Sequence, residues 1–257
     1  MTGDLRRASA GTPTGRASRY GFDFMTKWTQ FTQRALTDDS LQRERRGFRR
    51  WLLAPHIAFV IPIDEEAVRA QLIDWQRGFL DVLPYQPEPV ERLHVTLHYV
   101  GLLRTSPWML LPNTWQRASL DAMAARIGRA LAQCEPFTIL IGPLNAFPNV
   151  LIAEVHDTEE ECLRAMRLRV RRALPLRARP ATQWNYLPHI TLGYWGQQLV
   201  APLIERLRPF RDVEPVPLRV SRLRFTIYWR SPLPATPDVL VRAREELIAE
   251  YPLTPRE

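Results

Sequence analysis

The sequence predicts an α+β fold in which two similar lobes face each other across a cleft. Apolar, β-branched runs of strand character alternate with segments of helical periodicity, and the order of strand, helix and strand occurs twice along the chain. No glycine-rich phosphate loop follows any predicted strand, which argues against a dinucleotide-binding sheet. With 257 residues, of which 46% are hydrophobic, the chain is long enough to bury a substantial core.

The N-terminal part differs from the rest in composition. Residues 1–24 are rich in Arg, Ser, Thr, Gly and Ala without periodicity, and we interpret them as a flexible basic leader. Residues 25–55 carry apolar side chains at helical spacing and end in a charged run, which predicts an appended amphipathic helix. Residues 1–55 hold 11 basic and 5 acidic side chains, or +6 of the net charge of +8. The appended helix either packs on the main body with a solvated arginine face or docks RNA or phosphate.

The main body, residues 56–257, is predicted to be one two-lobed domain whose first strand, HIAFVIPI, begins at His56. Asp64 is the expected N-cap of the first helix, and a capping box of Thr158 and Glu161 is expected to begin a later one. The further elements are, in order, the strand LHVTLHYVG, a polar and aromatic loop, a helix over 117–134, strands near 136–145 and 149–155, a helix over 158–174, the strand LPHITLGYWG, a short helix near 197–208 and the long strand LRVSRLRFTIYWR. Residues 239–251 fit a helix or a strand.

A tetrad of the form His-apolar-Thr-Leu occurs twice, as His94-Val95-Thr96-Leu97 and as His189-Ile190-Thr191-Leu192. Side chains of a strand alternate between its faces, so the His and Thr of each tetrad share one face and the apolar pair shares the other. If the lobes face each other, the cleft receives two imidazoles and two hydroxyls.

Such a set suits phosphodiester chemistry. One neutral imidazole can take a proton from water or a hydroxyl while the other, protonated, gives one to the leaving oxygen. The threonine hydroxyls can donate hydrogen bonds to the non-bridging oxygens as charge develops there. A lone strand histidine is more often a satisfied structural residue, but two of only five histidines fall in matching contexts, which favours function. We interpret His56 and His156 as structural.

Further residues are weaker candidates for substrate binding. They are His98, Trp108, Trp115, Tyr228 and Arg224, with Arg222 and Arg230 as further cations of the late strand. His98 is expected on the same strand face as His94, and the two tryptophans are either base-stacking groups or core and loop anchors. Tyr228 and Trp229 alternate, so at most one of them faces the cleft.

No metal or cofactor is expected. Reading His94 and His98 as a metal pair requires a helix, whereas this segment has strand character. Cys134 and Cys162 have no second cysteine at metal-ligand spacing, which excludes a zinc ribbon or a disulfide scaffold. No run approaches the roughly 20 apolar residues of a membrane-spanning helix, and no secretion signal is recognisable, so we expect a cytoplasmic protein and no membrane partner.

The two tetrads resemble the signature of the two-histidine phosphoesterase superfamily, which includes the LigT-like 2′-5′ RNA ligases. The resemblance covers about residues 56–232. It implies a bilobal fold of two antiparallel-rich sheets with flanking helices, related by a pseudo-twofold axis around a central cleft, and chemistry without a metal. It also implies that His94 is the acid, that His189 is the base, and that Thr96 and Thr191 hold the phosphate. Many LigT-like proteins have a basic residue shortly after the second motif, where this chain has Gly193-Tyr194-Trp195.

The first hypothesis is therefore a metal-independent 2′,3′-cyclic phosphodiesterase that acts as a monomer on an RNA terminus or a nucleotide, with reversible 2′-5′ RNA ligation as a further activity. A second hypothesis is a module that binds an RNA end or nucleotide without chemistry. A third keeps the chemistry but takes a cyclic dinucleotide or another small phosphodiester. A bell-shaped pH profile would distinguish an acid–base pair from simple binding.

Overall fold

The computed structural model describes residues 24–26, 28–29, 55–81, 85–106, 113–147, 150–158, 160–178, 186–195, 200–229 and 244–255. Nearly all of the expected leader, most of the expected appended helix, Trp108 and Arg230 lie outside the described residues. Within the described residues no helix is both long and apolar enough to cross a membrane.

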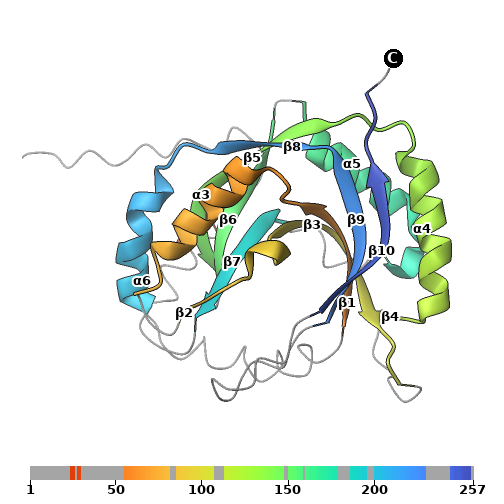
Figure 1. Ribbon diagram of the computed structural model, residues 1–257, viewed down its shortest axis with the longest axis horizontal. Coiled ribbons are helices and arrows are strands. Elements are labelled where there is room, and N and C mark those ends of the chain that lie inside the picture. The colour runs from red at the N-terminus through yellow and green to blue at the C-terminus, as the bar shows by residue number, and fades with distance from the viewer. Residues whose placement is uncertain are drawn as a thin grey trace, which may run out of the picture.

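Helices and strands are interspersed along the chain in an α+β fold, with runs of two or three consecutive strands between some of the helices (Figure 1). In chain order they are β1 (His56–Pro62), α3 (Glu66–Arg77), β2 (Tyr85–Pro87), η1 (Val90–Arg92), β3 (His94–Leu103), β4 (Thr114–Trp115), α4 (Arg117–Leu131), β5 (Phe137–Phe147), β6 (Val150–Asp157), α5 (Cys162–Ala173), η2 (Leu176–Ala178), β7 (His189–Trp195), α6 (Val200–Leu207), η4 (Arg208–Arg211), β8 (Val216–Val220), β9 (Arg222–Trp229) and β10 (Arg244–Pro252).

The strands form one sheet in the order β10-β9-β1-β3-β7-β6-β5-β8, with β2 added to β7 and β4 to β3. All described pairs are antiparallel except β3 with β4. The two antiparallel sheets expected for the lobes are thus joined through β3 and β7, with four strands of the main path on each side of the joint. This order is compatible with the expected pseudo-twofold relation. Figure 1 shows that the sheet curls, with α3 and α6 on the left and α4 on the right beyond β9 and β10.

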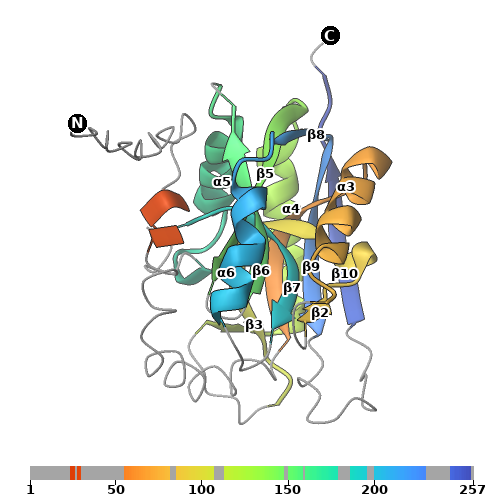
Figure 2. The same ribbon diagram turned by 90° about the vertical axis from the view of Figure 1, so that its left-hand side faces the viewer.

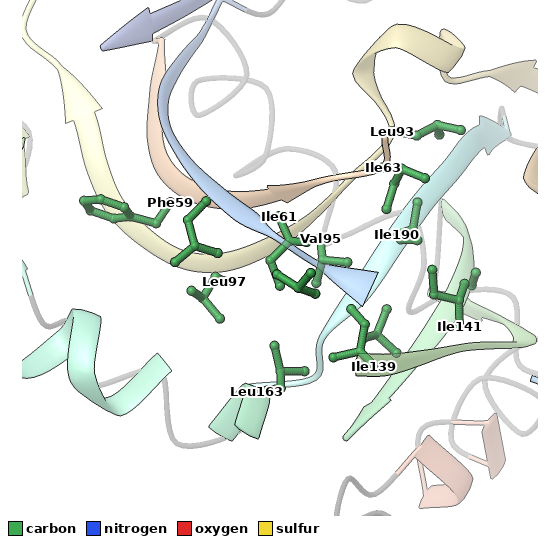
Figure 3. Packing of buried hydrophobic residues seen from close by; sticks show 14 of the residues in the cluster. Phe59, Ile61, Ile63, Leu93, Val95, Leu97, Ile139, Ile141, Leu163 and Ile190 are labelled. Atoms are coloured by element: carbon green, nitrogen blue, oxygen red, sulfur yellow. The ribbon is translucent and has the colours of Figure 1, made fainter. Parts of the chain in front are cut away.

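The core lies between one face of the sheet and the helices. Apolar side chains recur three or four residues apart on α3, α4 and α5, so each helix buries one stripe. Figure 3 shows the strand side chains that these stripes meet, from β1, β3, β5 and β7. Every residue of β1 is buried, as suits an interior strand with neighbours on both sides.

The two expected helix caps are wrong, and each error has a tertiary cause. Glu65, not Asp64, precedes α3, because the Asp64 carboxylate forms an ion pair with Arg222 at 2.7 Å. The expected capping box is absent, since α5 begins only at Cys162. The carboxylate of Asp157 instead accepts hydrogen bonds of 3.0 and 2.9 Å from backbone N–H groups in the first turn of α5. The long late strand is broken at Ser221 into β8 and β9, and the ambiguous segment 239–251 contributes strand β10.

Candidate active site

The two tetrads lie side by side in the middle of the sheet. Strand β3 pairs antiparallel with β7, and Val95 is the direct partner of Ile190. Both side chains are fully buried and belong to the core shown in Figure 3. Directly opposed residues point to the same face and their neighbours to the other. The two histidines and two threonines therefore share the face opposite the core, as the alternation predicts; they are His94, Thr96, His189 and Thr191.

Both imidazoles are held by the same kind of hydrogen bond. The Nδ1 atom of His94 lies 2.7 Å from the carbonyl oxygen of Arg92, and Nδ1 of His189 lies 2.8 Å from that of Leu187. Each carbonyl belongs to the residue two positions earlier. Because a carbonyl can only accept, Nδ1 carries the proton in both rings, and the neutral imidazole keeps its basic lone pair on Nε2.

Aromatic neighbours fix the planes of the two rings. The ring of Tyr228 on β9 stacks on His94 with 4.6 Å between centroids and 19° between planes. Phe147 on β5 meets His189 edge-on, at 5.1 Å and 89°. Contacts of these two geometries are favourable for aromatic rings and restrict their rotation. The four elements β3, β7, β9 and β5 thus position the two imidazoles together.

Burial shifts the pKa of His189. Removal from water penalises the imidazolium and lowers the pKa of His189 from its ordinary value, while its hydrogen bond to the Leu187 carbonyl opposes this shift. The net lowering favours the neutral form near pH 7. A neutral imidazole whose Nε2 carries the lone pair is equipped to accept a proton.

Tyr186 links the two tetrads from the segment that leads into β7. Its hydroxyl donates a hydrogen bond of 2.7 Å to the carbonyl oxygen of Thr96 on β3. The guanidinium of Arg167 on α5 lies 4.0 Å from the centre of the tyrosine ring. The approach to the second tetrad is therefore tied to the backbone of the first.

A polar pocket borders His94. Of the expected substrate contacts, Tyr228 and Arg224 line it, together with Asp64, Arg92 and Glu245. Arg224 is also bonded to Glu250 at 2.8 Å and lies 4.0 Å from Asp64. These carboxylates offset much of its positive charge. Burial raises the pKa of Glu245, although Arg224 and Arg92 oppose the shift.

Arg222 shares both carboxylates with Arg224. It pairs with Asp64 at 2.7 Å and with Glu250 at 3.3 Å. Neither arginine of this pair is an uncompensated cation. The positive charge of these two substrate-binding candidates is therefore partly neutralised by Asp64 and Glu250.

His98 does not lie on the face expected for it. Its partner on β1 is Phe59, a core residue, whereas the partner of Thr96 is Val60, because a bulge at Leu97 shifts the register. The extra residue turns His98 toward the core, where it is 1% exposed and its Nε2 lies 3.0 Å from the carbonyl of Ala178. The expectation that His98 borders the cleft is wrong.

Trp115 is a core anchor and not an exposed stacking platform. It is 2% exposed and donates a hydrogen bond of 3.2 Å to the carbonyl of Val100. The guanidinium of Arg177 lies 3.9 Å from the centre of its ring. Of the two alternatives open for the tryptophans, the anchor applies here. Trp108 lies outside the described residues.

A buried polar cluster on the same face was not anticipated from the sequence. Glu154 on β6 is the direct partner of His189 and accepts hydrogen bonds from Asn145 at 2.6 Å and from Arg211. Nε2 of His156 lies 3.0 Å from the other carboxylate oxygen. The available signal was a glutamate and a histidine spaced two residues apart at the end of the apolar run that begins β6. Among the described residues no group of three or more His, Cys, Asp or Glu side chains is placed to hold a metal ion.

Solved structures of other proteins show the same fold. Escherichia coli LigT, crystallised with phosphate, is 17% identical with a TM-score of 0.52, and the match covers 79% of this chain and 99% of that one. A second, TT0787 of Thermus thermophilus, is 19% identical with a TM-score of 0.50 over 77% of this chain and 97% of that one. No curated protein matches the chain.

The family comparison extends over most of the chain. The model of the 2′-5′ RNA ligase superfamily matches residues 52–231, a span that contains both tetrads. This match covers more than half of the sequence. It includes β3 and β7, the two strands that pair at Val95 and Ile190. The chain therefore belongs to the 2′-5′ RNA ligase superfamily.

Proposed function

We propose that the protein is a metal-independent RNA or nucleotide 2′,3′-cyclic phosphodiesterase that uses His94 and His189 as its acid–base pair. The family supports an enzyme of phosphodiester chemistry. The observation that carries the finer proposal is the shared sheet face, on which both imidazoles bind a carbonyl through Nδ1 and keep Nε2 for proton transfer. E. coli LigT has been crystallised with phosphate and with 3′-AMP, which supports a nucleotide end as the substrate.

In the proposed reaction, Nε2 of neutral His189 takes a proton from water as the water oxygen bonds to phosphorus. The bond from phosphorus to one ribose oxygen breaks, and protonated His94 gives its proton to that oxygen. The product is a ribose phosphomonoester with a free hydroxyl. The hydroxyls of Thr96 and Thr191 donate hydrogen bonds to the non-bridging oxygens while negative charge grows on them.

The lowered pKa of His189 supports its assignment as the base rather than the acid, because the base must be neutral when the substrate binds. Ligation follows the same path with the 5′-hydroxyl of a second RNA in place of water. His189 takes the proton from that hydroxyl as its oxygen bonds to phosphorus, the bond from phosphorus to the 3′ ribose oxygen breaks, and protonated His94 gives its proton to that oxygen. The two histidines exchange roles only when the 2′-5′ linkage is cleaved back to the cyclic phosphate.

The test uses a short RNA ending in a 2′,3′-cyclic phosphate, with chelator present, and follows the product by mass and by phosphatase sensitivity. We expect the gain of one water and a phosphatase-sensitive end. His94→Gln and His189→Gln should each lower kcat by about 100-fold or more, the usual contribution of a general acid or base. His56→Gln, a histidine outside the two tetrads, is the matched control. Unchanged RNA mass with retained binding would favour the binding module, and a cyclic dinucleotide would then be tried.

A further inference from the structure

A segment that precedes the family-matched residues packs on the same sheet face as the two tetrads. It comprises residues 24–26 and 28–29, which are helical and coloured red in Figure 2. Phe24 is 1% exposed, and its ring meets that of His156 edge-on with 5.2 Å between centroids. The backbone oxygen of Phe24 accepts a hydrogen bond of 3.4 Å from Asn145.

Arg211 of η4 joins this segment to the sheet. Its guanidinium lies 5.2 Å from the ring centre of Trp28 and 3.7 Å from the sulfur of Met25. The same guanidinium is paired with Glu154 and donates to the carbonyl of Leu144 at 2.6 Å. Apolar, aromatic and charged contacts thus hold the segment on β5 and β6.

The segment covers the part of the face that lies next to His189. Glu154 is the direct partner of His189 across the sheet, and His156 lies two residues further along β6 on the same face. Glu154, His156 and Asn145 are polar groups on the face opposite the core, yet they are only 2%, 5% and 0% exposed. Polar side chains on this face are buried because Phe24 and Arg211 lie over them.

We propose that Phe24 and its neighbours close the β6 side of the site and restrict the enzyme to the ends of RNA chains and to small phosphodiesters. This inference rests on the proposed function, which places the phosphorus between His94 and His189. A chain that continued past His189 over β6 would need the space that Phe24 occupies. On the opposite side of the site, a polar pocket lined by Arg92, Arg224 and Tyr228 borders His94. A linkage inside a longer RNA requires room on both sides.

The experiment compares four proteins, namely the full chain, a deletion of residues 1–23, a deletion of residues 1–29, and the full chain with Phe24→Ala. The deletion of residues 1–23 is the matched control, since it keeps every described contact of the segment. Two RNAs are used, one ending in a 2′,3′-cyclic phosphate and one with a single 2′-5′ linkage in its middle. Far-UV circular dichroism and thermal unfolding check that each protein is folded. If the protein that lacks residues 1–29 is unfolded, the comparison of Phe24→Ala with the full chain decides the test.

We expect the full chain and the control to favour the terminal substrate. Deletion of residues 1–29 and Phe24→Ala should raise the ratio of kcat/KM for the internal linkage to that for the terminal phosphate by about tenfold or more, because a steric block is removed. An unchanged ratio in both variants overturns the inference. So does a full chain that cleaves the internal linkage as readily as it opens the terminal phosphate.

The proposed function and the closing role of Phe24 are tested separately. If the full chain leaves the terminal cyclic phosphate intact, the proposed function fails, and the equilibrium binding of the same two RNAs then tests the segment. We expect Phe24→Ala to bind the internally linked RNA about tenfold more tightly relative to the terminal one. Equal relative affinity in the full chain and in Phe24→Ala overturns the inference.

Discussion

The hydroxyl of Tyr186 is bonded to the carbonyl oxygen of Thr96 at 2.7 Å, so a residue of the second half of the chain holds the backbone of the first tetrad. Tyr186 lies three residues before His189. The single bond therefore couples the approach to one imidazole with the strand that carries the other.

Tyr186→Phe removes only the hydroxyl and leaves the Thr96 carbonyl without that donor. We expect a loss of about 1 kcal/mol in the free energy of unfolding, the usual net value of such a hydrogen bond. We also expect a lower kcat with little change in KM, because the two tetrads lose a mutual restraint. Denaturant unfolding and steady-state kinetics measure both quantities. If Tyr186→Phe equals the parent protein in stability and in kcat, the bond has no such role.

Tyr228→Leu removes the ring that stacks on His94 but keeps a buried apolar side chain. A stacked aromatic pair contributes about 0.5–1.5 kcal/mol beyond its buried area, and we expect kcat to fall by up to about tenfold as His94 gains rotational freedom. Tyr228→Phe keeps the ring and is the control, with kcat near that of the parent. Equal loss in the Phe and Leu variants would assign the effect to the hydroxyl and contradict the stacking argument.

The lowered pKa of His189 makes stability depend on pH. The unfolded chain takes up a proton at the ordinary value of 6.5, whereas the folded protein resists protonation until a lower pH. The His189 contribution is therefore fully present above pH 6.5 and is lost as pH falls from there toward the folded pKa. Denaturant unfolding at about pH 7.5 and about pH 5.5 should show a larger loss for the parent than for His189→Gln. An identical loss in both proteins would contradict burial as the cause.

The lowered pKa of His189 also predicts the pH at which activity falls on the acidic side of the pH–rate profile. If neutral His189 is the base, kcat/KM should stay high below pH 6.5 and fall only near the lowered pKa of the free enzyme. A pH–rate profile on the terminal cyclic phosphate measures this limb. A limb that lies above pH 6.5 would contradict the assignment of His189 as the base.

Glu154→Gln removes the charge that balances Arg211 within the buried cluster. The two side chains are 3% and 13% exposed, so an unpaired guanidinium there is poorly solvated. We expect a loss of about 3 kcal/mol in the free energy of unfolding. Glu161→Gln is the matched control, because its partner Arg164 is 45% exposed and the pair is open to solvent. Similar, small effects in the two variants would show that the cluster does not stabilise the fold.

Strand alternation was sufficient to predict which side chains of the tetrads share a face, because that pattern is a local property of the backbone. It failed at His98, since the bulge at Leu97 depends on how β3 pairs with β1 and has no signal in the segment itself. Trp115 became a core residue through its contact with Val100 on another strand.

The cluster around Glu154 could not be predicted from the local sequence either. Asn145 and Phe24, which meet at one hydrogen bond, are 121 residues apart in the sequence. The α5 cap likewise comes from Asp157, a residue of the preceding strand, and not from the Thr158–Glu161 pattern. Contacts between distant segments decide these features.

The pairing of Val95 with Ile190 also limits how early during synthesis the two tetrads can come together. During synthesis, a chain that has emerged only as far as β6 has one of the two tetrads and lacks the other. A nascent or truncated chain of that length therefore has only one histidine of the proposed acid–base pair. The two tetrads meet only when β7 takes its place between β3 and β6, and His94 gains its stacking partner later still, when β9 with Tyr228 pairs with β1.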